Sequence, residues 1–213
     1  MPHDHHDHEG LSPSGHPYRA DQDTALSYWQ VMEIAIRELM IDKGVVTAAE
    51  VSAQVDAMDA RTPAQGAAVV ARAWTDAAFR ARLLADGSAA CAEMGFDVGP
   101  MKLIAVENTE DAHNVVVCTL CSCYPRNLLG LPPDWYKSRA YRSRTVREPR
   151  TVLSEFGLDL SADTTVRVHD STADMRYLVV PARPAGTEDL DQAALADLVT
   201  RDSMIGVGVA RDP

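Results

Sequence analysis

Apolar residues recur with helical spacing near the start of the chain. Between residues 24 and 43 they include Leu26, Trp29 and Met40, separated by steps that return to one helical face, and Gly44 follows directly. Apolar positions three, four and seven apart share a face of an α-helix, and glycine commonly ends one. The pattern predicts an amphipathic helix over residues 24–43.

Helix-start signals continue after this segment. Thr47 is followed three residues later by Glu50, the spacing of a capping box, and this predicts a helix through about Met58. Thr62-Pro63 predicts a cap and a first-turn proline for a third helix. Further helical stretches are expected to end near Gly87 and Gly95. We therefore expect a helical arm over residues 21–95.

The pattern then changes to short runs rich in β-branched and apolar residues. Strands are predicted over 102–106, 114–119, 166–168 and 176–180. Between them, residues 136–150 suggest two short helices interrupted by Pro149; residues 190–199 suggest another helix, and 204–209 a last extended segment. The predicted fold class is α+β, with the helical arm followed by an α/β domain over residues 96–213.

The first twenty residues have a different composition, because they hold five of the seven histidines together with Asp, Pro, Ser and Gly. No apolar periodicity is visible there, so we expect a flexible His/Asp-rich tail over residues 1–20. Such a tail could loosely hold or help deliver a metal ion, but a solvated leader is the interpretation that its composition favours.

Charge excludes several function classes. The chain has 31 acidic and 20 basic residues, a net charge of −11, which argues against nucleic acid as a partner because phosphate binding needs basic surfaces. No apolar run approaches the roughly 18 residues of a membrane span, and no signal peptide is recognisable at the N-terminus. We expect a cytoplasmic protein that does not bind membranes.

Three of the four cysteines, Cys118, Cys121 and Cys123, lie within six residues. A disulfide framework spreads its cysteines along the chain, whereas such a cluster is typical of a metal site. The C-x-x-C part alone also fits a redox dithiol or half a zinc site. Tetrahedral zinc would need a distant fourth donor, with His113 and Cys91 as candidates. A non-catalytic zinc or redox module is therefore one open interpretation.

The C-x-C part favours different chemistry. Both sulfurs can reach one ion only if the backbone wraps around it, which brings the amide nitrogens of Ser122 and Cys123 within bonding distance. Three sulfurs and two amidate nitrogens would occupy five positions of an octahedron and leave the sixth for water or substrate. This donor set suits a trivalent ion such as Co(III) or Fe(III) better than Zn(II).

Longer motifs around the cluster resemble a known family. They are Val117-Cys-Thr-Leu-Cys-Ser-Cys-Tyr-Pro125, Leu129-Gly-Leu-Pro-Pro-Asp-Trp-Tyr-Lys137, Tyr141-Arg-Ser-Arg144, Val146-Arg-Glu-Pro-Arg150 and Val199-Thr-Arg-Asp-Ser-Met-Ile-Gly-Val207. With these motifs the chain resembles the α subunit of nitrile hydratase from about Met32 to Val209. The resemblance implies a helical arm followed by a layered α/β metal-binding domain.

The resemblance also implies a cofactor and roles for the residues of the cluster. Cys118 would remain a thiolate, Cys121 would become a sulfinate and Cys123 a sulfenate, with the amides of Ser122 and Cys123 as further ligands. Thr119 resembles the cobalt type, so one Co(III) per chain is expected rather than Fe(III). Cys121, Ser122 and Cys123 would take part in hydrating a nitrile to the amide. The attacking oxygen comes either from hydroxide on the metal or from the sulfenate, and the sequence leaves both routes open.

Partners follow from the same resemblance. A β-type subunit, or two smaller β-like subunits, would supply arginines to the oxidised sulfurs, and a cobalt-insertion activator protein is a further expected partner. Oxidised sulfurs cannot be buried unpaired, so arginine is their natural neighbour. The chain's own basic residues near the cluster could contribute, although for each one a solvated face or subunit contact is favoured: Arg126, Arg142, Arg144 and Arg147.

Two positions depart from the family pattern. Arg126 stands where nitrile hydratases usually have a pocket tryptophan, and Gly99 stands where they often have a glutamine. An arginine there resembles the γ subunit of thiocyanate hydrolase and would favour an anion. A bulky polar nitrile, as in the related toyocamycin nitrile hydratase, also fits. The prediction is a cobalt nitrile hydratase α subunit with Arg126 in the substrate pocket; the alternative is a thiocyanate hydrolase γ-type subunit.

Overall fold

The computed structural model describes residues 25–213, so the tail predicted over residues 1–20 lies outside the described part. The chain divides into two compact units, one ending at Ala60 and the other running from Arg61 to Pro213. None of the helices in the described part is long and apolar enough to cross a membrane. The fold is mixed α and β, as predicted. The predicted domain boundaries at residues 20 and 95 stay predictions.

The described part of the first unit consists of two helices, α1 (Tyr28–Asp42) and α2 (Ala48–Asp59). Both begin at capping boxes, formed by Ser27 with Gln30 and by Thr47 with Glu50, which satisfy backbone N–H groups that lack a partner in the first turn. These helices confirm the predictions from spacing and caps. The apolar stripe of α1 is not buried: Trp29 is 77% exposed.

The second unit begins with α3 (Ala64–Thr75), α4 (Ala77–Ala85) and α5 (Gly87–Glu93). Asp76 and Asp86 accept the N-terminal amides of α4 and α5 and fix where those helices start. In α3, Pro63 occupies the cap position rather than the first turn. These three helices fall within the second compact unit, where α4 and α5 both contact β1 (Lys102–Glu107).

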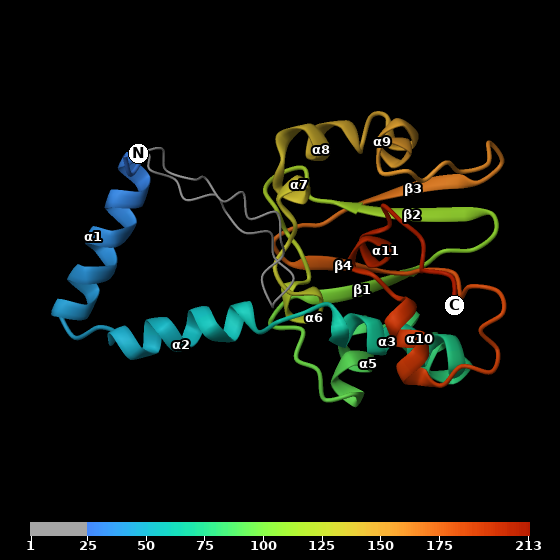
Figure 1. The fold of residues 1–213 in the computed structure, drawn as a ribbon, viewed down its shortest axis with the longest axis horizontal. Helices are drawn as coiled ribbons and strands as arrows, with labels where there is room; N and C mark the ends of the chain where they lie inside the picture. The colour runs from blue at the N-terminus through green and yellow to red at the C-terminus, as the bar shows by residue number, and fades with distance from the viewer. Residues whose placement is uncertain (1–24) are drawn as a thin grey trace, which may run out of the picture. The chain divides into compact units, whose positions relative to one another are not determined.

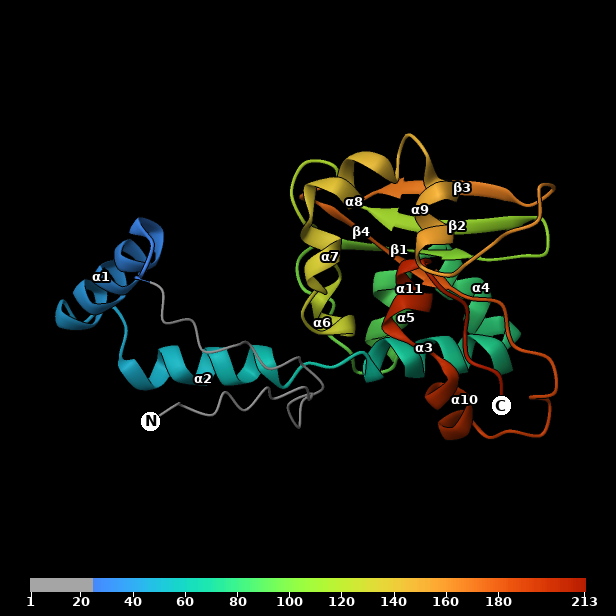
Figure 2. The same cartoon turned by 45° about the horizontal axis from the view of Figure 1, so that its top comes forward.

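Two separate pairs of parallel strands form the centre of this unit. Strand β1 pairs with β4 (Met175–Val180), and β2 (Ala112–Val117) pairs with β3 (Thr165–Asp170). Both pairs join segments far apart in sequence. Helices α3, α4, α5 and α10 (Gln192–Leu198) lie on the β1–β4 side, and helices α8 (Arg139–Arg144) and α9 (Pro149–Glu155) lie on the β2–β3 side (Figures 1 and 2). The result is the expected layered α/β arrangement.

The remaining helices are short. They are α6 (Arg126–Leu129), α7 (Asp134–Lys137) and α11 (Arg201–Ile205). The extended segment predicted over residues 204–209 is therefore wrong in its first part. Thr200 and Ser203 form a capping box that starts α11, and Gly206, with φ of 90°, ends it in the left-handed conformation. This pair of signals outweighs the β-branched composition.

Candidate metal centre

The three clustered cysteines lie where β2 ends. All six residues of β2 are buried, which anchors the strand between the layers, and the chain leaves it at Cys118. The cysteine loop, defined as residues 118–123, then turns toward the surface. Cys118 is fully buried, Cys123 is half-buried, Cys121 is exposed, and all three are free thiols. One ligand-type side chain is thus fixed in the core and the others face accessible space.

The sulfur atoms of this loop lie close together. Cys121 Sγ is 3.4 Å from Cys118 Sγ and 3.2 Å from Cys123 Sγ, and all three lie within 4.8 Å of one another. Within residues 25–213, this is the one group of three or more His, Cys, Asp or Glu side chains placed to hold an ion. The cluster predicted from sequence can therefore bind a metal.

The two side chains considered as a fourth zinc ligand, His113 and Cys91, have other surroundings. The ring of His113 lies between the Asn108 side chain and the carbonyl oxygen of Gly206, at 3.2 and 2.7 Å. Cys91 lies in α5, where burial raises the pKa of its thiol to about 12. Neither belongs to the group of three sulfurs. A tetrahedral zinc site would thus have three side-chain ligands from the described residues and lack a fourth.

Backbone amides of the loop face the sulfurs. Cys121 N donates to Cys118 Sγ at 3.3 Å. The pKa of Cys121 lies below its ordinary value because the thiols of Cys123 and Cys118 donate to its thiolate, and the N–H groups of Ser122 and Cys123 act in the same direction. Burial instead raises the pKa of Cys123 to about 12. The N–H groups of Ser122 and Cys123, the amides predicted as ligands, thus act electrostatically on the Cys121 sulfur, while the hydrogen bond to a sulfur comes from Cys121 N.

Three side chains from outside the loop hold its backbone. Asp170, at the end of β3, accepts bonds from Thr119 N at 2.9 Å and Thr119 Oγ1 at 2.6 Å. The hydroxyl of Tyr136 donates to the Cys123 carbonyl at 2.8 Å, and Arg142 Nη1 donates to the Cys121 carbonyl at 2.7 Å. The loop conformation is thus imposed by distant parts of the chain.

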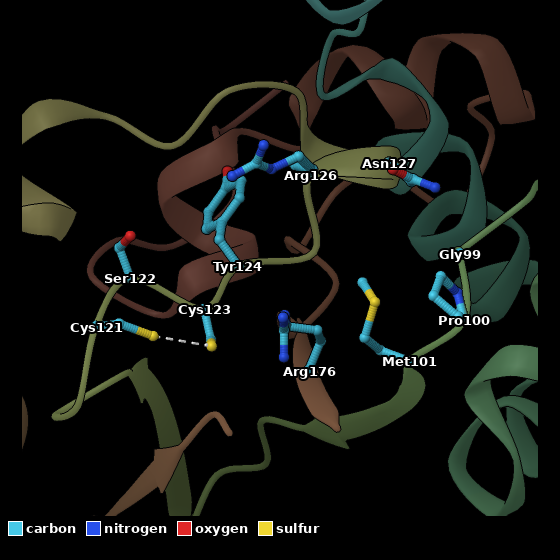
Figure 3. A pocket seen from close by; sticks show the side chains of 10 residues that line it. All are labelled: Gly99, Pro100, Met101, Cys121, Ser122, Cys123, Tyr124, Arg126, Asn127 and Arg176. Atoms are coloured by element: carbon cyan, nitrogen blue, oxygen red, sulfur yellow. Dashed lines mark hydrogen bonds between the residues drawn. The ribbon is translucent and has the colours of Figure 1, made fainter. Parts of the chain in front are cut away.

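A cavity of about 340 Å³ opens beside the loop (Figure 3). It is lined by Gly99, Pro100, Met101, Cys121, Ser122, Cys123, Tyr124, Arg126, Asn127 and Arg176. The two positions that depart from the family pattern therefore both line it. A Cβ atom at Gly99 would lie 3.3 Å from Asn127 Nδ2, and its φ of +80° disfavours other residues. With glycine at this position, no side chain extends from this part of the wall into the cavity.

Arg176 is a cavity residue that sequence reasoning missed. It lies in β4, far along the chain from the cysteines, and lines the same cavity as Cys123 (Figure 3). Its Nη1 donates to the carbonyl oxygens of Ala173 and Met175, at 3.2 and 3.1 Å. Its positive charge acts to lower the pKa of Cys123, against the larger effect of burial. The Nε atom is buried and has no hydrogen-bond partner among the described residues. Only the β1–β4 pairing brings this residue to the site, and no local motif marks it.

The other basic residues near the loop differ in their partners. Arg144 forms ion pairs with Glu148 and Glu155, both with N–O distances of 2.6 Å. Arg147 Nε donates to the Ser143 carbonyl at 3.0 Å. These two arginines stabilise the helices around them, whereas Arg126 faces the cavity and Arg142 touches the loop.

Comparisons with known proteins agree with this geometry. Residues 27–208 match the family model described as nitrile hydratase, alpha chain. The chain is 50% identical over 183 residues to the low-molecular weight cobalt-containing nitrile hydratase subunit alpha of Rhodococcus rhodochrous, covering 84% of this chain and 87% of the relative. It is 39% identical over 198 residues to the thiocyanate hydrolase subunit gamma of Thiobacillus thioparus, covering 87% and 82% of the two chains.

A solved structure gives the same result for the fold. An iron-type nitrile hydratase double mutant from Comamonas testosteroni Ni1 aligns with a TM-score of 0.83 at 44% identity, over 89% of this chain and 94% of that one. The family match spans nearly all of the described residues, including the cysteine loop and every strand. The chain therefore belongs to the nitrile hydratase alpha-chain family, whose members are enzyme subunits.

Proposed function

We propose that the chain is the α-type subunit of a cobalt nitrile hydratase, which adds water to a nitrile to give the amide. The observation that carries the proposal is the cysteine loop, where the sulfurs of Cys118, Cys121 and Cys123 all lie within 4.8 Å of one another. The 50% identity to a cobalt-containing relative supports cobalt as the metal.

In this proposal Cys118, Cys121 and Cys123 with the amide nitrogens of Ser122 and Cys123 hold one Co(III). The bound ion would act as a Lewis acid on the nitrile, which makes its carbon electrophilic. Oxidation of Cys121 to the sulfinate and of Cys123 to the sulfenate would place charged oxygens at the cavity. Arg176 would pair with oxygen on Cys123, because both side chains line the cavity and the charge of Arg176 already acts on the Cys123 thiol.

Partner subunits belong to the same proposal. The relatives are named as subunits, and a β-type subunit would cover the exposed Cys121 and supply further arginines to the oxidised sulfurs. The uncovered apolar side chains of α1, such as Trp29, and Leu120 at the apex of the loop, 84% exposed, are consistent with such a partner. A cobalt-insertion activator protein is proposed as a transient partner.

The cavity wall supports two substrate classes. Arg126, Asn127 and Arg176 make the wall polar, and Gly99 leaves space, which favours a bulky polar nitrile over a small apolar one. The same Arg126 supports the second candidate function, a thiocyanate hydrolase γ-type subunit, because a guanidinium binds an anion by charge-assisted hydrogen bonds.

A first experiment tests the centre. The chain, purified with its partner from cobalt-supplemented cells, should contain about one cobalt, and intact mass should show added oxygens on the cysteine loop. Zinc with unmodified cysteines would overturn the proposal.

A second experiment separates the substrates. The kcat/KM values for an aromatic nitrile and for thiocyanate are compared in the wild type, Arg126→Gln and the control Arg139→Gln, which changes an exposed arginine outside the cavity. A nitrile hydratase prefers the nitrile in every variant. If thiocyanate is preferred and Arg126→Gln lowers its turnover by about 10- to 100-fold, the value of one charged hydrogen bond, the second candidate is correct.

A further inference from the structure

Arg142 contacts one particular peptide of the cysteine loop. Its Nη1 donates to the carbonyl oxygen of Cys121 at 2.7 Å. That carbonyl belongs to the peptide whose nitrogen is Ser122 N, one of the two amide nitrogens proposed as metal ligands. Tyr136 contacts the Cys123 carbonyl instead, and the nitrogen of that peptide belongs to Tyr124, which is no ligand. Of these two residues, only Arg142 donates a hydrogen bond to a peptide whose nitrogen is a proposed ligand.

No acidic side chain of residues 25–213 forms an ion pair with Arg142, whereas Arg144 in the same helix is paired with two glutamates. Arg142 Nε is buried and has no hydrogen-bond partner among the same residues. Arg142 is half-buried, and the part of its guanidinium that is withdrawn from water is costly unless negative charge compensates it. A neutral peptide carbonyl is therefore a poor final partner for this guanidinium.

Metal binding would supply the missing negative charge. When an amide nitrogen binds a metal ion, the N–H proton passes to solvent and the nitrogen lone pair forms the new bond. Because the peptide is conjugated, the negative charge is shared with the carbonyl oxygen. The hydrogen bond from Arg142 then becomes a bond between two charged groups, and such bonds are roughly twice as strong as neutral ones.

We propose that Arg142 is a positioning residue of the metal centre, which stabilises the metal-bound form of the Cys121–Ser122 peptide through its carbonyl oxygen. This inference rests on the proposed function, since it assumes that the cysteine loop binds cobalt through Ser122 N. It assigns a role to the guanidinium charge itself, beyond holding the loop in place.

The test uses the full chain with its partner and three variants. Arg142→Gln removes the charge but retains N–H donors, and Arg142→Lys retains the charge. Arg147→Gln is the matched control, because Arg147 also donates to a backbone carbonyl but lies away from the loop. Cobalt content, resistance of bound cobalt to a chelator at constant pH, and the number of nitrogen and sulfur neighbours by X-ray absorption are measured. Unfolding of the cobalt-free proteins reports any purely structural effect.

We expect Arg142→Gln to lower the apparent cobalt affinity about tenfold or more and to reduce the nitrogen neighbours of cobalt by one, while the cobalt-free protein unfolds almost as the wild type does. Arg142→Lys should recover most of the affinity, and Arg147→Gln should match the wild type. Normal cobalt binding and an unchanged X-ray absorption spectrum in Arg142→Gln would overturn the inference.

The remaining outcomes also decide. Equal loss in Arg142→Lys and Arg142→Gln would overturn the role of charge. If Arg142→Gln does not fold, Arg142→Met, which keeps the aliphatic stem without the charge, replaces it, and normal cobalt binding by that variant would overturn the inference. If the wild type itself binds no cobalt, the proposed function fails. A loaded wild type with an unaffected Arg142→Gln variant contradicts only the role given to Arg142.

Discussion

The hydroxyl of Tyr136 provides a quantitative test of how the cysteine loop is held. Tyr136 is fully buried, and its hydroxyl donates to the Cys123 carbonyl at 2.8 Å. Substitution to phenylalanine keeps the ring packing and leaves that carbonyl without its donor. Loss of one such bond costs about 1.5 kcal/mol of unfolding free energy. For a chain of this size, about 1.5 kcal/mol corresponds to a decrease of about 3–6 °C in Tm.

The matched control is Tyr124→Phe. Tyr124 is also buried, but its hydroxyl lies 3.5 Å from the Leu129 carbonyl, at the limit of a hydrogen bond, so removing it should lower the Tm by less than about 2 °C. Thermal unfolding of the cobalt-free chain, followed by circular dichroism, measures both. The reasoning is refuted if the two variants lose the same stability, or if Tyr136→Phe unfolds like the wild type.

Three further predictions follow from the packing and the pKa shifts. Gly206→Ala should lower the free energy of unfolding by about 4 kcal/mol or more, because the new Cβ would lie 1.9 Å from a backbone oxygen of β2. The effect would be seen as loss of soluble protein or a large decrease in Tm. Gly157 also has a positive φ but open space around it, so Gly157→Ala should cost only about 1–2 kcal/mol. Burial lowers the pKa of His113 from 6.5, so the unfolded state binds more protons, and stability present above pH 6.5 is lost as the pH falls below it. Urea unfolding at pH 7.5 and 5.5 should therefore show a smaller loss of stability in His113→Gln than in the wild type. An equal loss in the two proteins would contradict this. In the native cobalt-free chain, iodoacetamide should modify Cys121, which is exposed and has a lowered pKa, before it modifies the buried Cys91; mass spectrometry that finds Cys91 labelled first would disprove the assignment.

Much of the fold could be predicted from local signals. The capping box at Thr47 consists of short side-chain-to-backbone interactions, so it acts wherever the sequence places it. The caps at Asp76 and Asp86 are of the same local kind but were not predicted. The α11 helix was missed because the apolar residues after Met204 resemble a strand, whereas its start depends on the cap at Thr200. Strand pairing was outside the reach of local patterns, because β1 with β4 and β2 with β3 are joined by long-range contacts.

The candidate site divides in the same way. Cys118, Cys121 and Cys123 were recognisable because their chemistry depends on close spacing in sequence. Arg126 was found as a departure from a motif, and it does line the cavity. Arg176 was not found, because nothing in its neighbourhood distinguishes it from a surface arginine of a strand. Its place at the cavity depends on the parallel register that aligns it with Leu103.

The three side chains that hold the cysteine loop bear on when the loop takes its shape during synthesis of the chain. Asp170, Tyr136 and Arg142 all lie later in the chain than the cysteines that they position. While the ribosome is still making β3, the sulfurs have already emerged but the side chains that shape their loop are incomplete. In such a nascent chain the three thiols would lie on a loop without a fixed conformation, and ions other than cobalt could bind them. If the loop binds cobalt as proposed, selective loading would follow the synthesis of residue 170, since only then are all three contacts of the loop available.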